Sequence, residues 1–220
     1  MSRVKKAVLF ILVVFTLVLI TMPAHGKGSA KFGLTQINSD STTLSASIDQ
    51  TWDNPIIDLV IETDYVYKEQ EDLVKMDKFS TIFKANKDLS DKFYTFGVAS
   101  YDSDQLRDTG DRIVGGAGLG WKIFRNDFWK ISHESSLAYL TTDLVDEAIF
   151  RNSLWIFYKL GKNLNITNKL LSETGTDNYL RNETSINYSL TEKVSLGFSN
   201  TYTEDPIDNN VLSVTIGVKW

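Results

Sequence analysis

The last ten residues, VLSVTIGVKW at positions 211–220, decide the fold of this chain. From Leu212 onward, apolar side chains alternate with polar or small ones without a break. The apolar set is Leu212, Val214, Ile216, Val218 and Trp220, and the other set is Ser213, Thr215, Gly217 and Lys219. Alternation with a period of two predicts a β-strand that has one apolar and one polar face.

The N-terminal end has the pattern of a secretory signal peptide. Arg3, Lys5 and Lys6 precede an unbroken apolar run from Ala7 to Ile20, and small residues follow up to Gly26. Such a run is shorter than the roughly 20 residues of a membrane-spanning helix, and the pattern predicts cleavage near Gly26. We therefore expect residues 1–26 to be a signal peptide and residues 27–220 to form one domain. An uncleaved anchor is the alternative.

Composition excludes several classes of function. Three of the 23 basic residues and none of the 28 acidic ones lie in residues 1–26, so the remaining chain has a net charge of 20 minus 28, or −8. A chain this acidic is a poor partner for nucleic acid. The sequence has 0 Cys, which excludes disulfides, zinc–thiolate sites and thiol catalysis. We expect no cofactor.

The alternation of residues 211–220 recurs along the whole chain. Twelve stretches of about ten residues are separated by clusters of Asp, Asn, Gly, Ser and Lys, the weak signature of a transmembrane barrel. The expected strands are 29–37, 42–52, 56–67, 74–85, 92–101, 112–123, 128–141, 148–160, 164–172, 179–190, 194–203 and 210–220. The strand 92–101 is ambiguous, because Phe93, Tyr94 and Phe96 fall on both faces.

Alternation alone does not say whether the apolar face meets lipid or a protein core, since soluble lipocalin-like barrels alternate too. Tight connections at one end and longer, acidic ones at the other favour the membrane barrel, with both termini in the periplasm. Tryptophan sorting favours it as well, because an aromatic girdle marks a membrane interface. The predicted periplasmic girdle is Trp52, Trp121, Trp129 and Trp220. The sequence thus predicts an all-β, up-and-down antiparallel transmembrane barrel.

The polar face of these strands collects charges of both signs. In a barrel this face lines the lumen, where charges must be paired or hydrated. The expected lumen-lining residues are Asp58, Glu62, Asp64, Lys78, Arg112, Lys122, Lys130, Glu134, Arg151, Arg181 and Glu183. They either plug the barrel as an ion-pair network or line a narrow polar conduit.

Three glycines, Gly116, Gly118 and Gly120, share one face of the expected strand 112–123. Their spacing does not fit a dinucleotide-binding loop, because the third glycine of that motif would fall at Trp121. We expect them to clear space for bulky neighbours, with Trp155 and Phe157 as candidates.

The middle of the chain resembles a known family. Its motifs are Tyr94-Thr95-Phe96-Gly97, Tyr101-Asp102, Asp111-Arg112 and the glycine-rich run Gly115–Trp121. These residues, with Asn182-Glu183-Thr184 and the aromatic end, resemble the salt-induced outer membrane protein family, the YdiY-like proteins of unassigned function. The resemblance extends from about Lys31 to Trp220. It implies an outer-membrane barrel and no established chemistry.

One catalytic scheme remains open. His133 and Ser135 share a strand face, and Asn152 on the next strand would lie close to Ser135 if the chain turns near Leu144. A serine, a base and an orienting amide on the outer wall resemble the outer membrane phospholipase A family, in which the histidine accepts the serine proton. The continuation of that family's motif is absent, because Ser136-Leu137-Ala138 follows.

The sequence therefore predicts an outer-membrane barrel without an assigned activity. A narrow or occluded channel, or an envelope protein that responds to salt, is the first hypothesis. Alternatives are a lipid hydrolase that uses Ser135, and a soluble exported barrel. Expected partners are outer-membrane lipid and the barrel assembly machinery, which would recognise the C-terminal strand. The oligomeric state cannot be read from the residues.

Cleavage of the signal peptide can be tested directly. Protein extracted from the outer membrane should begin near Lys27 when its N-terminus is sequenced. An N-terminus at Met1 in the mature protein would instead favour the uncleaved anchor.

Overall fold

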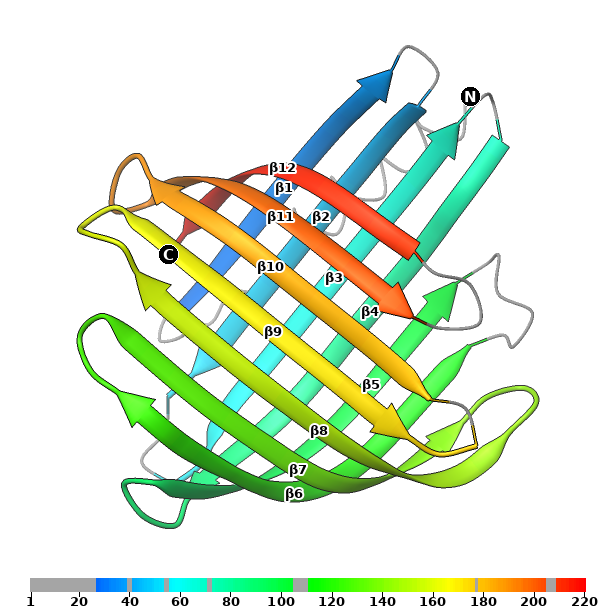
Figure 1. The fold of residues 1–220 in the computed structure, drawn as a ribbon, viewed down its shortest axis with the longest axis vertical. Helices are drawn as coiled ribbons and strands as arrows, with labels where there is room; N and C mark the ends of the chain where they lie inside the picture. Colours follow the sequence, from blue (N-terminus) through cyan, green and yellow to red (C-terminus); the bar gives the residue numbers. More distant parts are fainter. Residues whose placement is uncertain are drawn as a thin grey trace.

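The computed structural model describes residues 27–38, 41–53, 56–70, 73–104, 111–176, 178–204 and 209–220. The expected signal peptide lies outside these residues. The chain forms twelve β-strands and a closed barrel in which each strand pairs antiparallel with its sequence neighbours. The strands, labelled in Figure 1, are β1 (Lys27–Asn38), β2 (Ser41–Trp52), β3 (Asp58–Gln70), β4 (Leu73–Asp88), β5 (Phe93–Asp104), β6 (Arg112–Arg125), β7 (Trp129–Thr141), β8 (Asp146–Lys159), β9 (Leu164–Thr174), β10 (Tyr179–Ser189), β11 (Val194–Glu204) and β12 (Asn209–Lys219).

The expected strands all exist, and their ends differ from the expected ones by no more than three residues. The largest differences are the ends of β3, β4 and β5, each of which continues three residues beyond the expected end. Because β3 continues to Gln70 and β4 begins at Leu73, the loop expected at 68–73 is reduced to residues 71–72. No helix long and apolar enough to cross a membrane is present among the described residues.

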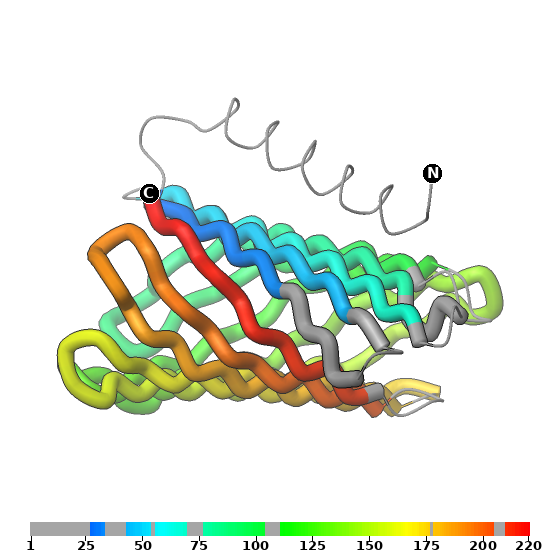
Figure 2. Tube along the Cα trace, turned by 90° about the horizontal axis from the view of Figure 1, so that it is seen from above, coloured from blue at the N-terminus to red at the C-terminus, as the bar shows by residue number. Residues whose placement is uncertain are grey.

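The barrel closes where the first strand meets the last. β1 pairs with β12 from Ser29 opposite Lys219 to Gly33 opposite Thr215. Gly28 and Trp220 extend this seam, since each backbone N–H donates to the other's carbonyl oxygen at 3.2 Å. Figure 2 shows the two strands side by side, in blue and red. The seam pairs the backbone groups that two sheet edges would otherwise leave open.

The apolar face of the strands points outward. On β6, Val114 faces inward and is fully buried, whereas Leu119 faces outward and is 62% exposed. The same alternation places Leu137 of β7 and Ile216 of β12 on the outer surface. A soluble lipocalin-like barrel would bury this face inside. The soluble alternative therefore does not fit, because the large apolar side chains form the outer wall.

The two ends of the barrel carry different sets of connections. The turn end carries 53–57, 89–92, 126–128, 160–163 and 190–193, and the loop end carries 39–40, 71–72, 105–111, 142–145, 175–178 and 205–208. The expected contrast between tight turns and longer loops holds for 105–111 but not for the two-residue connections 39–40 and 71–72. Side chains close the turns locally. Asn126 Oδ1 accepts hydrogen bonds from the N–H groups of Phe128 at 2.9 Å and Trp129 at 2.6 Å. Gly161 has φ of 92°, a left-handed conformation that glycine adopts without strain.

The four tryptophans of the expected girdle lie at the turn end. Trp52 ends β2, and Trp129 begins β7 and stacks on Tyr158 with ring centroids 4.1 Å apart. Trp121 stacks on Phe93 at 6.3 Å, where β5 begins. The indole N–H of Trp220 donates to Gln50 Oε1 at 3.1 Å, so it covers an outward-facing amide near the seam.

The glycine row of β6 faces inward, and a side chain from β5 occupies the space above it. A Cβ atom on Gly120 would overlap the ring of Tyr94. Trp155 and Phe157, the residues expected to fill this space, stack on each other on β8, with ring centroids 6.0 Å apart. From the sequence, the inward face of strand 92–101 was ambiguous, because its aromatic residues fall on both faces. The structure places the Tyr94 ring in the interior.

We predict that Gly120→Ala lowers the free energy of unfolding by about 1–3 kcal/mol, the usual result of overpacking. The reason is that the added methyl group displaces the Tyr94 ring. Gly115→Ala on the same strand is the matched control, because its Cβ would meet nothing within 4 Å. Urea unfolding of the refolded protein in detergent measures both. Equal stability of the two variants would contradict this packing.

Candidate functional site

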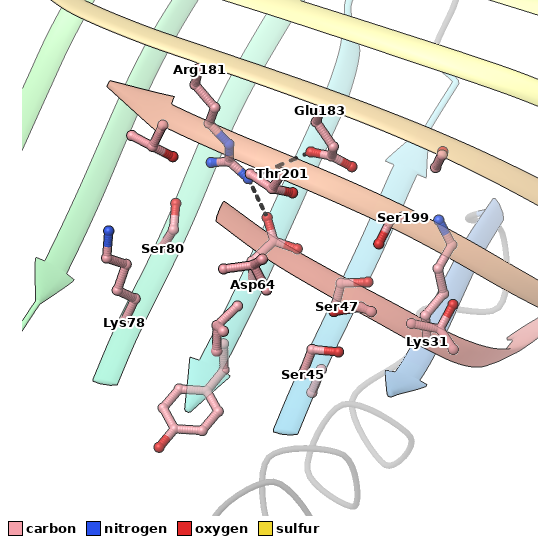
Figure 3. A pocket seen from close by; sticks show the side chains of 18 of the residues that line it. Lys31, Ser45, Ser47, Asp64, Lys78, Ser80, Arg181, Glu183, Ser199 and Thr201 are labelled. Carbon is pink, nitrogen blue, oxygen red and sulfur yellow. Dashed lines mark hydrogen bonds and ion pairs between the residues drawn. The ribbon is translucent and has the colours of Figure 1, made fainter. Parts of the chain in front are cut away.

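Two cavities lie inside the barrel. The larger, of about 700 Å³, is toward the turn end, and its walls include Glu62, Lys84, Glu134, Trp155 and Lys169. The smaller, of about 150 Å³, is toward the loop end and is drawn in Figure 3. The two cavities share several lining residues: Lys31, Ser47, Asp64, Arg181, Glu183, Ser185 and Asn187. These shared residues mark the level at which one cavity gives way to the other.

A buried ion-pair cluster lies at the loop end of the lumen, centred on Glu173 of β9. The Glu173 side chain is 2% exposed and forms ion pairs with two guanidinium groups. One is Arg112 of β6, and the other is Arg151 of β8, whose Nε lies 2.8 Å from Oε1. Asp102 of β5 lies 3.6 Å from Arg112, and the ring of Tyr179 lies 5.0 Å from that guanidinium. The cluster links β5, β6, β8 and β9, with its charges balanced two to two.

A second cluster is centred on Glu134 of β7. Its Oε1 accepts hydrogen bonds from the Lys84 ammonium and the Tyr94 hydroxyl, and its Oε2 accepts one from Ser153 at 3.2 Å. The Lys84 ammonium also lies 4.8 Å from the centre of the Phe96 ring. The Glu134 carboxylate therefore holds the Tyr94 ring over Gly120 of the glycine row, because the Tyr94 hydroxyl and the Lys84 ammonium both donate to Glu134 Oε1.

A third set of ion pairs crosses the lumen. The Lys169 ammonium on β9 lies 3.2 Å from Glu62 on β3. Arg181 on β10 lies 3.7 Å from Asp64 on β3 and 3.5 Å from Glu183 on its own strand. β3 and β9 are diametrically opposite in the strand order, with five strands between them in either direction. Figure 3 shows Arg181 and Asp64 pointing toward each other across the interior. We call Glu62, Asp64, Lys169 and Arg181 the cross-lumen pairs.

The remaining inner walls carry mostly hydroxyl and amide groups. On β10, β11, β12 and β2 the side chains that line the cavities include Ser45, Ser47, Ser185, Asn187, Ser199, Thr201, Ser213 and Thr215. Such groups both donate and accept hydrogen bonds, so this wall can replace part of the hydration shell of a polar solute.

The structure places most of the expected lumen residues around these cavities. The residues that line one or both cavities are Glu62, Asp64, Lys78, Arg112, Glu134, Arg151, Arg181 and Glu183. The other three lie nearer the turn end. Lys122 is 2.7 Å from Asp88, Lys130 lies 5.4 Å from the Phe157 ring, and Asp58 shares the inward row of β3.

Sequence reasoning missed two acidic residues of the lumen, Asp102 and Glu173. The strands were expected to end at residues 101 and 172, whereas β5 and β9 continue to Asp104 and Thr174. Both carboxylates therefore lie on strands, on the inward face. The charge of Asp102 and Glu173 did not distinguish a strand from a loop, because acidic residues at the end of an alternating stretch are equally typical of a loop.

The histidine–serine scheme lies on the outer wall. Asn152 is opposite Ser135 in the β7–β8 register, and the Ser135 hydroxyl donates to Asn152 Oδ1 at 2.8 Å. His133 is opposite Leu154 instead. Within the described part of the chain no hydrogen bond joins His133 to Ser135 or to Asn152. The serine proton therefore points to the amide, and the amide does not orient the imidazole, so this arrangement differs from a catalytic triad.

The described residues contain no group of three or more His, Asp or Glu side chains placed to hold a metal ion. Asp104, at the end of β5, and Asp108 are not covered by this statement, because the structure does not describe their side chains.

Residues 30–220 match a family model described as protein of unknown function, DUF481. No curated protein matches the chain in sequence. Among solved structures, the NanC porin is 10% identical with a TM-score of 0.58, covering 88% of this chain and 98% of its own. An outer membrane channel from Pseudomonas putida F1 is 9% identical with a TM-score of 0.56, covering 91% and 97%. The KdgM porin in complex with disordered oligogalacturonate is 11% identical with a TM-score of 0.53, covering 87% and 98%. These likenesses concern the fold.

We predict that Glu173→Gln lowers the free energy of unfolding by about 3–5 kcal/mol, as expected when one partner of a buried ion pair is removed. Arg112 and Arg151 would then be buried without their shared carboxylate. Asp53→Asn is the matched control, because Asp53 pairs with Lys27 at the exposed surface and should contribute less than about 1 kcal/mol. Similar losses in urea unfolding for the two variants would contradict a structural role for the Glu173 cluster.

Proposed function

The chain belongs to the family of proteins of unknown function described as DUF481, and we propose that it is a narrow channel for small polar solutes in the outer membrane of a Gram-negative bacterium. The observation that carries the proposal is a closed barrel, apolar outside, that holds two cavities with shared walls on which many charged, hydroxyl and amide side chains lie. An apolar outer wall suits lipid, and a polar interior gives a solute a path across it.

The width of the barrel supports a narrow path. Eight strands give an interior that side chains fill, and sixteen or more give an open aqueous channel. Twelve strands lie between these limits. The cross-lumen pairs reduce the opening further, because they join facing walls at the level where the two cavities meet.

The cellular context of this proposal comes from the sequence. Export through a cleaved signal peptide, residues 1–26, would deliver the domain 27–220 to the periplasm. The alternating C-terminal strand would then be recognised by the barrel assembly machinery, and Trp52, Trp121, Trp129 and Trp220 would lie at the periplasmic interface. The resemblance of the sequence to salt-induced outer membrane proteins supports a role under osmotic stress.

The outer-wall residues Ser135, His133 and Asn152 do not support a hydrolase. The Ser135–Asn152 hydrogen bond instead satisfies two polar side chains on a wall that faces lipid, where an unsatisfied group is costly.

Planar bilayers test the channel. The purified, refolded protein should give step-like conductance, and Arg181→Ala should raise the single-channel conductance by about twofold or more, because removing the guanidinium widens the constriction. Lys162→Ala, in an exposed turn at the turn end, is the matched control.

A heat-dependent shift on gels verifies that each variant is folded. No steps at any salt concentration or voltage would contradict the channel. An Arg181→Ala conductance equal to that of the control would contradict the constriction, and Asp64→Ala provides a second test of it.

A further inference from the structure

Acidic side chains gather on one part of the lumen wall. The inward residues of β2 and β3 from Thr43 to Val66 include four carboxylates and, in this described range, neither Lys nor Arg: they are Thr43, Ser45, Ser47, Asp49, Thr51, Asp58, Val60, Glu62, Asp64 and Val66. Lys169 and Arg181 face them from β9 and β10. This separation of charge is local, because Lys31 of β1 and Lys84 of β4 also line the larger cavity and Glu183 lies beside Arg181 on β10.

The lumen holds ion pairs of two kinds, which differ in their access to solute. In the Glu173 cluster the carboxylate is 2% exposed and the Arg151 side chain 9%. In the cross-lumen pairs, Lys169 is 43% exposed and Glu62 32%. Asp64 is 35% exposed and Arg181 23%. A solute in the cavities can therefore contact the cross-lumen pairs, whereas the Glu173 carboxylate is buried between its two arginines.

A solute that passes must separate the cross-lumen pairs, and the charge of the solute determines the free-energy cost of separating them. A cation bound to Glu62 leaves Lys169 without its partner, and an anion bound to Lys169 leaves Glu62 without its partner. An unpaired charge away from bulk water is strongly unfavourable. A molecule that carries both charges compensates both partners at once, so it can replace the ion pair without leaving a charge alone.

From this geometry we propose that the lumen has a binding site for small dipolar solutes that carry one ammonium and one carboxylate group. The solute ammonium lies against Glu62 and Asp64, and its carboxylate lies against Lys169 and Arg181. The proposal rests on the proposed channel function and names its solute class.

The larger cavity offers the remaining contacts. Its volume of about 700 Å³ is within the range of about 300–1,000 Å³ that is usual for small-molecule sites. Trp155 lines this cavity and is the cross-strand neighbour of Lys169. The Trp155 indole, beside the Lys169 side chain, gives the carbon chain of the solute an apolar surface. Ser185 and Asn187 add hydrogen-bonding groups on the next strand.

Block of the single-channel KCl current at pH 7 measures binding. The dipolar probe is γ-aminobutyric acid, and the comparison solutes are tetramethylammonium, methanesulfonate and the neutral amide butyramide. The half-blocking concentration of γ-aminobutyric acid should be about tenfold lower than that of each comparison solute, equivalent to about 1.4 kcal/mol.

Charge-removing variants give the sharper test. Glu62→Gln frees Lys169 and should move the preference to methanesulfonate, whereas Lys169→Gln frees Glu62 and should move it to tetramethylammonium. The double variant should conduct and show no preference for the dipolar probe. Asp88→Asn with Lys122→Gln, an ion pair at the turn end, is the matched control and should keep the wild-type order.

The outcomes separate this inference from the channel itself. Absence of conductance in the wild type would overturn both proposals. Normal conductance with equal block by the four solutes, or variants that keep the wild-type order, would overturn the dipolar site and leave the channel intact. The crossed shift of the two single variants would establish the site.

Discussion

Backbone pairing between β1 and β12 is the interaction on which the rest of the structure depends. A backbone N–H or C=O group that faces lipid without a partner costs several kcal/mol, so a sheet in a membrane must have no edge. This seam is short, from Ser29 opposite Lys219 to Gly33 opposite Thr215, with Gly28 and Trp220 beyond it. Once it closes, every strand has one face on the outer surface and one toward the interior, and alternation assigns each side chain to one of them.

Closure makes the interior polar, and the ion pairs then determine its shape. The Glu173 cluster joins strands on one side of the barrel, and its central carboxylate is buried. The cross-lumen pairs join opposite sides and remain accessible to solute. Both kinds compensate charge, and the cross-lumen pairs are the more exposed of the two. In the proposed channel, the requirement that a charge removed from water needs a partner thus gives the buried carboxylate a structural role and the accessible pairs a role in selection.

Sequence patterning could predict the barrel because alternation is a local property. The strand order, the strand ends within three residues and the apolar outer wall all follow from it. The pairing inside the lumen is not local. The alternation of side chains assigns Glu62 to one face of β3, but the contact between Glu62 and Lys169 depends on the diameter and stagger of the closed barrel. The strand 92–101 was ambiguous because its aromatic residues fall on both faces, and the contact that holds Tyr94 in the interior is not local either, since Glu134 comes from β7 rather than from an adjacent strand.

The account depends most on which face of the strands meets lipid, and residues 213–218 of β12 allow a direct measurement. Because the chain has 0 Cys, single cysteines can carry a spin label at each position in a lipid bilayer. Labels at 214, 216 and 218 should be accessible to oxygen dissolved in lipid, and labels at 213, 215 and 217 to a water-soluble nickel chelate. The opposite alternation, or equal accessibility along the strand, would contradict a barrel with an apolar wall in lipid and a polar lumen.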